Sequence, residues 1–145
     1  MKLESQNEYI YSLDQIAEVA GCLQGLMSYC SVFTFTGPLG AGKTTIIREL
    51  LGRLGVHDPV TSPTFTYVNV YSNNEGQRFY HFDLYRINSL DAFCQAGFDE
   101  YLFQPNSWTF IEWPEPIMSL LTHDTCNIYI DYCDDKRKIS IRRIE

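Results

Sequence analysis

Apolar residues recur at helical spacing in two stretches of the chain. The first stretch begins at Ser12, and Gln15 three positions later completes a capping-box pair that marks a helix start. The apolar face expected for this helix consists of Leu13, Ile16, Ala17, Ala20, Leu23, Met27 and Cys30. The second stretch runs from Thr44 to Leu54, and Gly55 follows it where a left-handed C-terminal cap is expected. The pattern therefore predicts two amphipathic helices before residue 56.

Runs rich in β-branched and aromatic residues predict six strands. These strands are expected at Val32–Thr36, Phe65–Tyr71, Phe79–Leu84, Trp108–Glu112, Cys126–Tyr132 and Lys138–Ile144. The second and third runs flank turn residues 73–76, and the last two flank Asp134 and Asp135, so each pair predicts a hairpin. Ser89 is expected to cap a short helix that ends near Gln95. This order of elements is typical of an α/β fold with a mixed sheet, flanking helices and hairpins.

Composition narrows the class of protein. The 145 residues are 45% hydrophobic and 20% charged, which excludes a disordered, collagen-like or coiled-coil chain. No repeat or linker interrupts the sequence, so we predict one domain that spans residues 1–145. The net charge of −7 argues against a broad basic surface for nucleic acid.

Other features bear on the cellular compartment. Every apolar run is far shorter than the roughly 20 residues of a membrane span, and residues 1–6 are polar, unlike a signal peptide. The five cysteines are odd in number and form no Cys-x-x-Cys pair, which is typical of buried, reduced thiols. We therefore expect a cytoplasmic protein that does not associate with membranes.

The clearest chemical signal is a phosphate loop between the first predicted strand and the second helix. Residues 37–44 read Gly-Pro-Leu-Gly-Ala-Gly-Lys-Thr, a complete G-x-x-x-x-G-K-[ST] motif. Glycines let backbone N–H groups approach phosphate oxygens, and the following helix directs its positive end at them. Lys43 is expected to reach the β- and γ-phosphates, and the Thr44 hydroxyl to ligate Mg²⁺. The residues predicted to bind a nucleoside triphosphate are Gly37, Gly40, Ala41, Gly42, Lys43, Thr44 and Thr45.

A second metal-binding element is expected among acidic residues that end buried strands. Glu112 follows Phe110 and Ile111, and Asp83 ends the run that begins at Phe79. An acid in this position binds Mg²⁺ directly or through water, or polarises an attacking water. A solvent-facing carboxylate is the alternative for either residue, and the sequence leaves open which of them touches the metal.

Three further groups of residues are weaker candidates. Thr61, Ser62 and Thr64 offer hydroxyls for the γ-phosphate or a water, although a Ser-Pro turn that enters a strand explains them equally. The three histidines have no ligand spacing, so surface or packing roles are expected. Trp108 and Trp113 flank the Glu112 strand end; both are expected in the core, with Trp113 a candidate sensor of nucleotide. The cluster at residues 136–138, with Arg142 and Arg143, indicates a solvated hairpin face or a docking surface for a partner or RNA.

Four segments occur together in a specific order. They are residues 37–45, Val60-Thr61-Ser62-Pro63-Thr64-Phe65, Phe79-Tyr80-His81-Phe82-Asp83-Leu84-Tyr85-Arg86 and Phe110-Ile111-Glu112-Trp113-Pro114-Glu115. A weaker fifth segment lies at residues 97–102. From about Ser12 to Ile144, the chain resembles the TsaE family (older name YjeE), small bacterial P-loop ATPases that serve tRNA threonylcarbamoyladenosine synthesis.

The resemblance implies a P-loop NTPase-like domain that hydrolyses ATP with Mg²⁺ and acts on the TsaB–TsaD complex, with tRNA involved only indirectly. Lys43, Thr64, Asp83 and Glu112 would then be catalytic, and Thr44, Asp83 and Glu112 would hold the metal. Residues 61–64 would form a switch-like segment. The family often has a threonine near the adenine in the first helix; residues 14–19 contain none, which leaves Tyr11 or Ser12 for that contact.

Other P-loop functions fit less well. Small-molecule kinases clamp phosphate with several arginines, whereas Arg86 is the only arginine between Arg78 and Arg137. The guanine-reading Asn-Lys-x-Asp motif of GTPases is absent, since residues 88–91 read Asn-Ser-Leu-Asp. A nucleotide-gated binding module with negligible turnover remains a third possibility, because hydrolysis in the family can depend on the partner.

Overall fold

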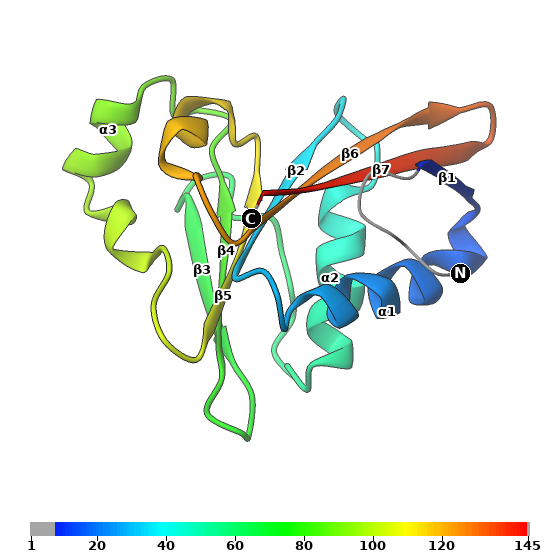
Figure 1. Ribbon diagram of the computed structural model, residues 1–145, viewed down its shortest axis with the longest axis horizontal. Helices are drawn as coiled ribbons and strands as arrows, with labels where there is room; N and C mark the ends of the chain where they lie inside the picture. The colour runs from blue at the N-terminus through cyan, green and yellow to red at the C-terminus, as the bar shows by residue number, and fades with distance from the viewer. Residues whose placement is uncertain (1–7, 145) are drawn as a thin grey trace.

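The computed structural model describes residues 8–144, so the polar segment at residues 1–6 lies outside the described part. A seven-stranded sheet runs in the order β1-β7-β6-β2-β5-β4-β3 (Figure 1). Its strands are β1 Glu8–Tyr11, β2 Val32–Thr36, β3 Val68–Ser72, β4 Arg78–Asp83, β5 Ser107–Glu112, β6 Thr125–Cys133 and β7 Lys136–Ile144. Strands β6, β2, β5 and β4 are parallel, whereas β7, β1 and β3 pair antiparallel with their neighbours. The predicted mixed sheet is therefore confirmed.

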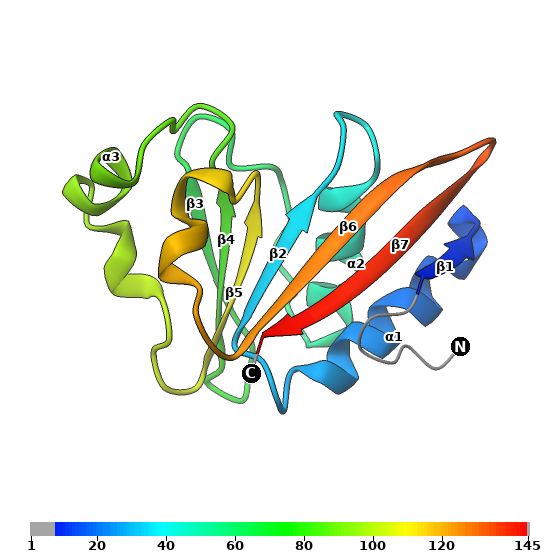
Figure 2. The ribbon, with the colours of Figure 1, turned by 45° about the horizontal axis from the view of Figure 1, so that its top comes forward.

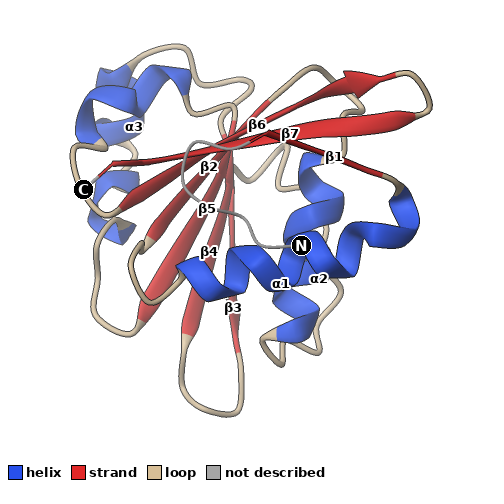
Figure 3. Cartoon of the chain, turned by 45° about the vertical axis from the view of Figure 1, so that its right-hand side comes forward, coloured by secondary structure: helices blue, strands red, loops and turns tan. Residues whose placement is uncertain are grey.

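Helices cover both faces of the sheet. The helices are α1 Ile16–Leu26, α2 Lys43–Arg53 and α3 Leu90–Gln95, with 3₁₀ turns η1 Leu13–Gln15, η2 Phe98–Tyr101 and η3 Glu115–Leu120. Figure 3 shows α1 and α2 together on one side of the sheet and α3 on the other. Two apolar clusters fill these layers, one around Phe33, Phe35 and Phe110 and the other around Phe82 and Phe93. Each helical layer thus seals one face of the sheet.

The first predicted helix is confirmed in position but not in every detail of its apolar face. The Ser12 backbone N–H donates to Gln15 Oε1 at 3.0 Å, as a capping box requires. Leu13 is 74% exposed, because it lies in η1 before the regular helix begins. Ala17 is also exposed, and Val19 instead faces the core with no exposed surface.

The strand predictions hold with two differences. β3 begins at Val68, three residues later than expected, because Tyr67 adopts a φ of 67° that interrupts an extended strand. The edge strand β1, which pairs Tyr9 with Ile139 of β7, was not predicted. Both predicted hairpins, β3–β4 and β6–β7, form with the expected antiparallel pairing.

The parallel strands bring their carboxyl ends to one edge of the sheet. In Figure 2 the chain leaves the end of β2, turns above the strand and returns into α2. Asp83 of β4 lies opposite Glu112 of β5, and Glu112 in turn lies opposite Phe35 of β2. Ligands of α/β proteins bind at this edge, so the two acids and the phosphate loop meet where a site is expected.

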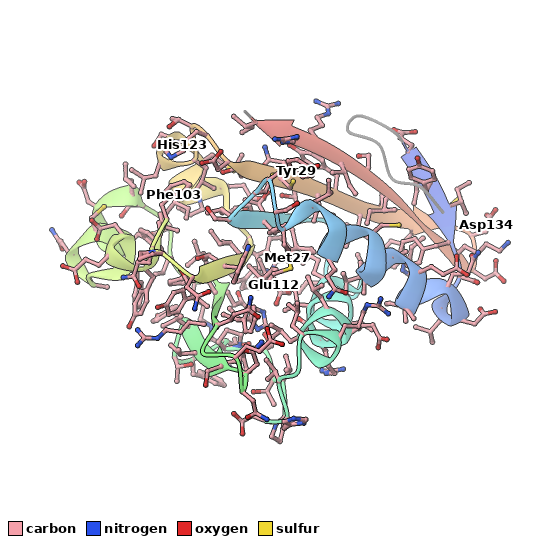
Figure 4. The ribbon with its side chains drawn as sticks, turned by 60° about the horizontal axis from the view of Figure 1, so that its bottom comes forward. Met27, Tyr29, Phe103, Glu112, His123 and Asp134 are labelled. Atoms are coloured by element: carbon pink, nitrogen blue, oxygen red, sulfur yellow. The ribbon has the colours of Figure 1, made fainter. Side chains whose placement is uncertain are left out.

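Cysteine and histidine predictions are only partly confirmed. No disulfide joins the cysteines within residues 8–144, but only Cys30 and Cys126 are buried, and Cys94 is exposed. His57 is exposed, and His123 lies at the surface beside Phe103, 4.4 Å between ring centroids (Figure 4). The third histidine, His81 in β4, is fully buried and lies beside Glu112. Within residues 8–144, no helix has the length and apolar character needed to cross a membrane.

Candidate functional site

The phosphate loop connects β2 to the first turn of α2. Gly42 caps α2 with a φ of 103°, and Gly40 has a φ of 77°, conformations that favour glycine. The Lys43 ammonium donates to the carbonyls of Gly37 and Pro38, the latter at 3.2 Å, and lies 3.8 Å from the centre of the Trp113 ring. Burial lowers the pKa of Lys43, and the nearby carboxylates, Glu112 first, oppose that shift. The lysine is thus held inside the loop, beside the helix N-terminus.

Gly37 is required by a close approach of two backbones. A Cβ at this position would lie 2.3 Å from the carbonyl oxygen of Ile130 in β6. We expect Gly37→Ala to lower the free energy of unfolding by about 1–3 kcal/mol, because the loop or β6 must move. Denaturant unfolding measures the change. Gly52→Ala is the matched control, because nothing lies within 4 Å of its Cβ and alanine favours a helix; equal stability of the two variants would contradict the prediction.

Thr44 and Glu112 form the centre of the site. The Thr44 hydroxyl, in the first turn of α2, lies 2.9 Å from both carboxylate oxygens of Glu112 at the end of β5. Glu112 is only 3% exposed, and its Oε2 also lies 2.6 Å from Nε2 of the fully buried His81. A buried carboxylate of this kind needs hydrogen-bond donors, and these two side chains supply them.

Asp83 forms a second acidic position that is joined to the hydroxyl-rich segment. Asp83 Oδ1 accepts the backbone N–H of Tyr85 at 3.0 Å, and Oδ2 accepts the Ser62 hydroxyl at 3.0 Å. The hydroxyls of Ser62 and Thr64 lie 3.2 Å apart. Thr61 instead uses its backbone N–H on the Tyr71 hydroxyl, away from the acids. The structure therefore brings Ser62 and Thr64, but not Thr61, to the site.

One open cavity of about 390 Å³ joins these groups. Its walls include the residues singled out for phosphate, metal or catalysis except Gly37 and Thr61, namely Gly40, Ala41, Gly42, Lys43, Thr44, Thr45, Ser62, Thr64, Asp83 and Glu112. Gly37 contributes only its carbonyl, which accepts from Lys43. Leu39, Tyr85, Arg86 and Trp113 complete the lining. The sequence therefore predicted the polar centre of the cavity and Trp113 as a candidate beside it, whereas the places of Leu39, Tyr85 and Arg86 in the lining follow only from the fold.

Trp113 lies at the cavity, as expected for a candidate sensor of nucleotide, and not in the core. It follows Glu112 with a φ of 57°, which turns its ring over Lys43 and against Tyr85 at 4.9 Å between centroids. The expected core position of Trp113 is therefore wrong, whereas Trp108 packs on the core and donates its Nε1–H to the carbonyl of Met27 at 2.9 Å. The sequence does not reveal the positive φ of Trp113. Its position directly after Glu112 was the only sequence signal that placed it near the site.

A second cavity of about 260 Å³ continues from the phosphate loop toward α1. It shares Gly40 to Gly42 and Thr45 with the first cavity and is completed by Tyr11, Leu13, Ile16, Asp135, Lys136 and Arg137. Ser12 is not part of its lining. The tip of the β6–β7 hairpin, marked by Asp134 in Figure 4, closes the second cavity on the side of the hairpin. Arg137 Nε donates to the Ala41 carbonyl at 3.2 Å, and the Tyr132 hydroxyl donates to the Leu39 carbonyl. Arg137 of the basic cluster is therefore bound to the phosphate loop.

The oxygen atoms at the edge of the cavity suit the chemistry of Mg²⁺. Among residues 8–144, no group of three or more His, Cys, Asp or Glu side chains is placed to hold a metal by itself. Thr44, Glu112 and Asp83 offer hard oxygen ligands at one edge of the cavity. Mg²⁺ in nucleotide sites is bound by one or two such groups together with phosphate oxygens and water. These residues therefore fit a Mg²⁺ that is shared with a nucleotide.

Comparisons with known proteins place the chain among its relatives. It is 41% identical over 105 residues to the tRNA threonylcarbamoyladenosine biosynthesis protein TsaE of Haemophilus influenzae. The aligned region covers 72% of this chain and 65% of the Haemophilus protein, so it spans slightly less than two thirds of that protein's length. The TsaE protein of Treponema pallidum is 35% identical over 117 residues, 80% of this chain and 84% of that one. The crystal structure of Bacillus subtilis YdiB has a TM-score of 0.73 at 26% identity, covering 100% of this chain and 90% of that one.

A family model also matches most of the chain. The model described as threonylcarbamoyl adenosine biosynthesis protein TsaE matches residues 10–139, which include the phosphate loop, both acids and the hydroxyl-rich segment. The match thus covers every element that lines the two cavities. With the fold and the relatives in agreement, the chain belongs to the TsaE family of threonylcarbamoyl adenosine biosynthesis proteins.

Proposed function

We propose that the chain binds ATP with Mg²⁺ and hydrolyses it to support the turnover of the TsaB–TsaD complex in tRNA threonylcarbamoyladenosine formation. The observation that carries the proposal is the contact between Thr44 and Glu112, 2.9 Å apart beneath the phosphate loop. A threonine in this loop and an acid on the neighbouring strand form the usual metal-binding pair of P-loop nucleotide hydrolases. Family membership supports the same pathway.

Each residue has a distinct role in this proposal. The backbone N–H groups of residues 40–45 and the N-terminus of α2 bind the phosphates, and Lys43 releases the loop carbonyls to reach the β- and γ-phosphates. The Thr44 hydroxyl would ligate the metal through its oxygen while its O–H donates to the carboxylate of Glu112. When bound, Mg²⁺ neutralises charge that develops on the phosphate oxygens. Asp83, with Ser62 and Thr64 beside it, orients water on the γ-phosphate side.

The adenine is placed in the second cavity. This cavity begins where the phosphate loop ends. Tyr11 and Ile16 give it apolar walls, and Lys136 and Arg137 add two cations. An aromatic ring and a guanidinium group suit a flat, neutral base. Tyr11, rather than Ser12, therefore takes the position in which relatives of the family often have a threonine.

Hydrolysis is favoured over transfer to a small acceptor. Among residues 8–144, Arg86 is the only arginine that lines the first cavity, whereas kinases supply several cations to an acceptor phosphate. The exposed rim instead presents Leu39, Phe65 and Tyr85, which are 67%, 79% and 56% exposed, so a protein partner has apolar surface to contact beside the site. The acidic chain gives tRNA only an indirect part.

Nucleotide binding is expected to change the fluorescence of Trp113. Its ring lies 3.8 Å from Lys43 Nζ, so a movement of Lys43 toward phosphate alters the environment of the indole. Titration of MgATP into the Trp108→Phe variant should give a saturable change in emission, and the same titration into Trp113→Phe should give almost none. A full signal in Trp113→Phe would contradict this assignment.

The catalytic part of the proposal is tested by release of inorganic phosphate. We expect slow release by the chain alone and faster release with the TsaB–TsaD complex. Binding of MgATP without release under either condition would instead identify a nucleotide-gated binding module, and transfer of the γ-phosphate to a small acceptor would identify a kinase.

A further inference from the structure

His81 is a buried ionisable side chain next to Glu112 that the proposed reaction does not use. It lies in β4 with no exposed surface, two residues before Asp83 and on the same face of the strand. Its Nε2 is 2.6 Å from Glu112 Oε2. A ring nitrogen at this distance from a carboxylate oxygen acts as the donor, so Nε2 carries the proton.

The hydrogen bonds of Glu112 divide unequally between its two oxygens. Oε2 is held by His81 and by Thr44, whereas Oε1 is held by Thr44 alone, at 2.9 Å. Thr44 belongs to the phosphate loop helix and must also serve the metal. His81 belongs to the sheet, whose strands β4 and β5 are paired along six residues, so it fixes one carboxylate oxygen independently of the loop.

We propose that His81 is the positioning residue of this site: its Nε2–H holds Glu112 Oε2, so that Oε1 stays directed at Thr44 and the metal side. The inference rests on the proposed function and extends it to a residue that touches neither nucleotide nor metal. Histidine suits the position because its ring is rigid and buried, whereas a flexible donor would allow the carboxylate to rotate. The imidazole therefore acts through Glu112 and not on the substrate.

A structural role alone would make a different prediction. If His81 only fills space, the change His81→Phe, which keeps an aromatic ring but removes both nitrogens, affects folding in the same way whether or not Glu112 is present. If His81 positions the carboxylate, its effect depends on Glu112. A double-mutant cycle that combines His81→Phe with Glu112→Ala separates the two roles.

The first test does not require activity. In denaturant unfolding, we expect His81→Phe to lower the midpoint in the wild-type background and to have little effect when Glu112 is alanine. In addition, the nitrogen NMR spectrum of the wild type should show His81 with a protonated Nε2 and an unprotonated Nδ1. Equal midpoint changes in both backgrounds, or a proton on Nδ1 instead, would overturn the proposal even if ATP hydrolysis is confirmed.

The second test measures the Mg²⁺ dependence of phosphate release in the presence of the TsaB–TsaD complex. We expect His81→Phe to need about tenfold more Mg²⁺ for half-maximal activity, with ATP binding in the absence of Mg²⁺ unchanged. His81→Gln, which restores an N–H donor, should recover part of the loss, and His123→Phe at the surface serves as the control. An unchanged Mg²⁺ requirement in His81→Phe would overturn the proposal. Absence of release by the wild type would instead defeat the proposed function, and the unfolding cycle would still decide the role of His81.

Discussion

Glu112→Gln is expected to lower ATP turnover with the TsaB–TsaD complex about a hundredfold or more, with ATP affinity nearly unchanged. Glutamine keeps the size of the side chain and one carbonyl oxygen, so the fold and the phosphate loop remain intact. It removes the negative charge that faces Thr44 at 2.9 Å and replaces one acceptor with an amide donor. That charge is needed on the metal side when the bond to the γ-phosphate breaks, so turnover falls more than binding.

Glu115→Gln provides the matched control. Glu115 begins η3 three residues later and is exposed. Of the three carboxylates that raise the pKa of Lys43, it has the smallest effect. Loss of its charge should change turnover by less than about threefold, since charges exposed to solvent interact weakly. A similar loss of turnover in both variants would mean that the overall negative charge near the site, and not Glu112 itself, supports the reaction.

Phe110→Ala is expected to lower the free energy of unfolding by about 3–5 kcal/mol, the largest stability effect we predict for a single change. Phe110 has no exposed surface, and its ring lies 5.6 Å from that of Phe33 and 6.5 Å from that of Phe79 between centroids. Its removal leaves a cavity in the centre of the layer between the sheet and α2, two residues before Glu112.

Thermal and denaturant unfolding measure this change, and a protein of this size should melt roughly 10 °C lower. Phe65→Ala is the control, because Phe65 is 79% exposed and its loss removes little buried surface. If Phe65→Ala destabilises the chain as much as Phe110→Ala, the described core does not carry the stability.

The sequence was sufficient for the parts of the site that depend on local chemistry. Residues 37–44 specify a loop whose backbone geometry needs glycine, and the observed φ angles of Gly40 and Gly42 agree. Glu112 and Asp83 could be selected because each ends a buried run, and parallel pairing of β4 and β5 then places them opposite each other. The same alternation places His81 and Asp83 on one face of β4, whereas the lack of ligand spacing among the histidines predicts only a surface or packing role for His81.

The remaining features depend on tertiary contacts that no local pattern encodes. β1 has only four residues and forms because β7 offers it an edge, as the pairing of Tyr9 with Ile139 shows. The contact of Arg137 with Ala41 joins residues 96 positions apart. Leu13 fits helical spacing yet is exposed, because the chain passes through a 3₁₀ turn before α1 begins. Periodicity identifies elements well and their ends poorly.

The rate of inorganic phosphate release from ATP, compared with and without the purified TsaB–TsaD complex, tests the central claim most directly. The wild-type chain should release phosphate slowly alone and at least about tenfold faster with the complex, at saturating ATP and Mg²⁺. Glu112→Gln, which retains ATP binding, should abolish the stimulated rate and so exclude a contaminating ATPase. A wild-type rate that does not respond to the complex, or a stimulated rate that survives in Glu112→Gln, would contradict the account.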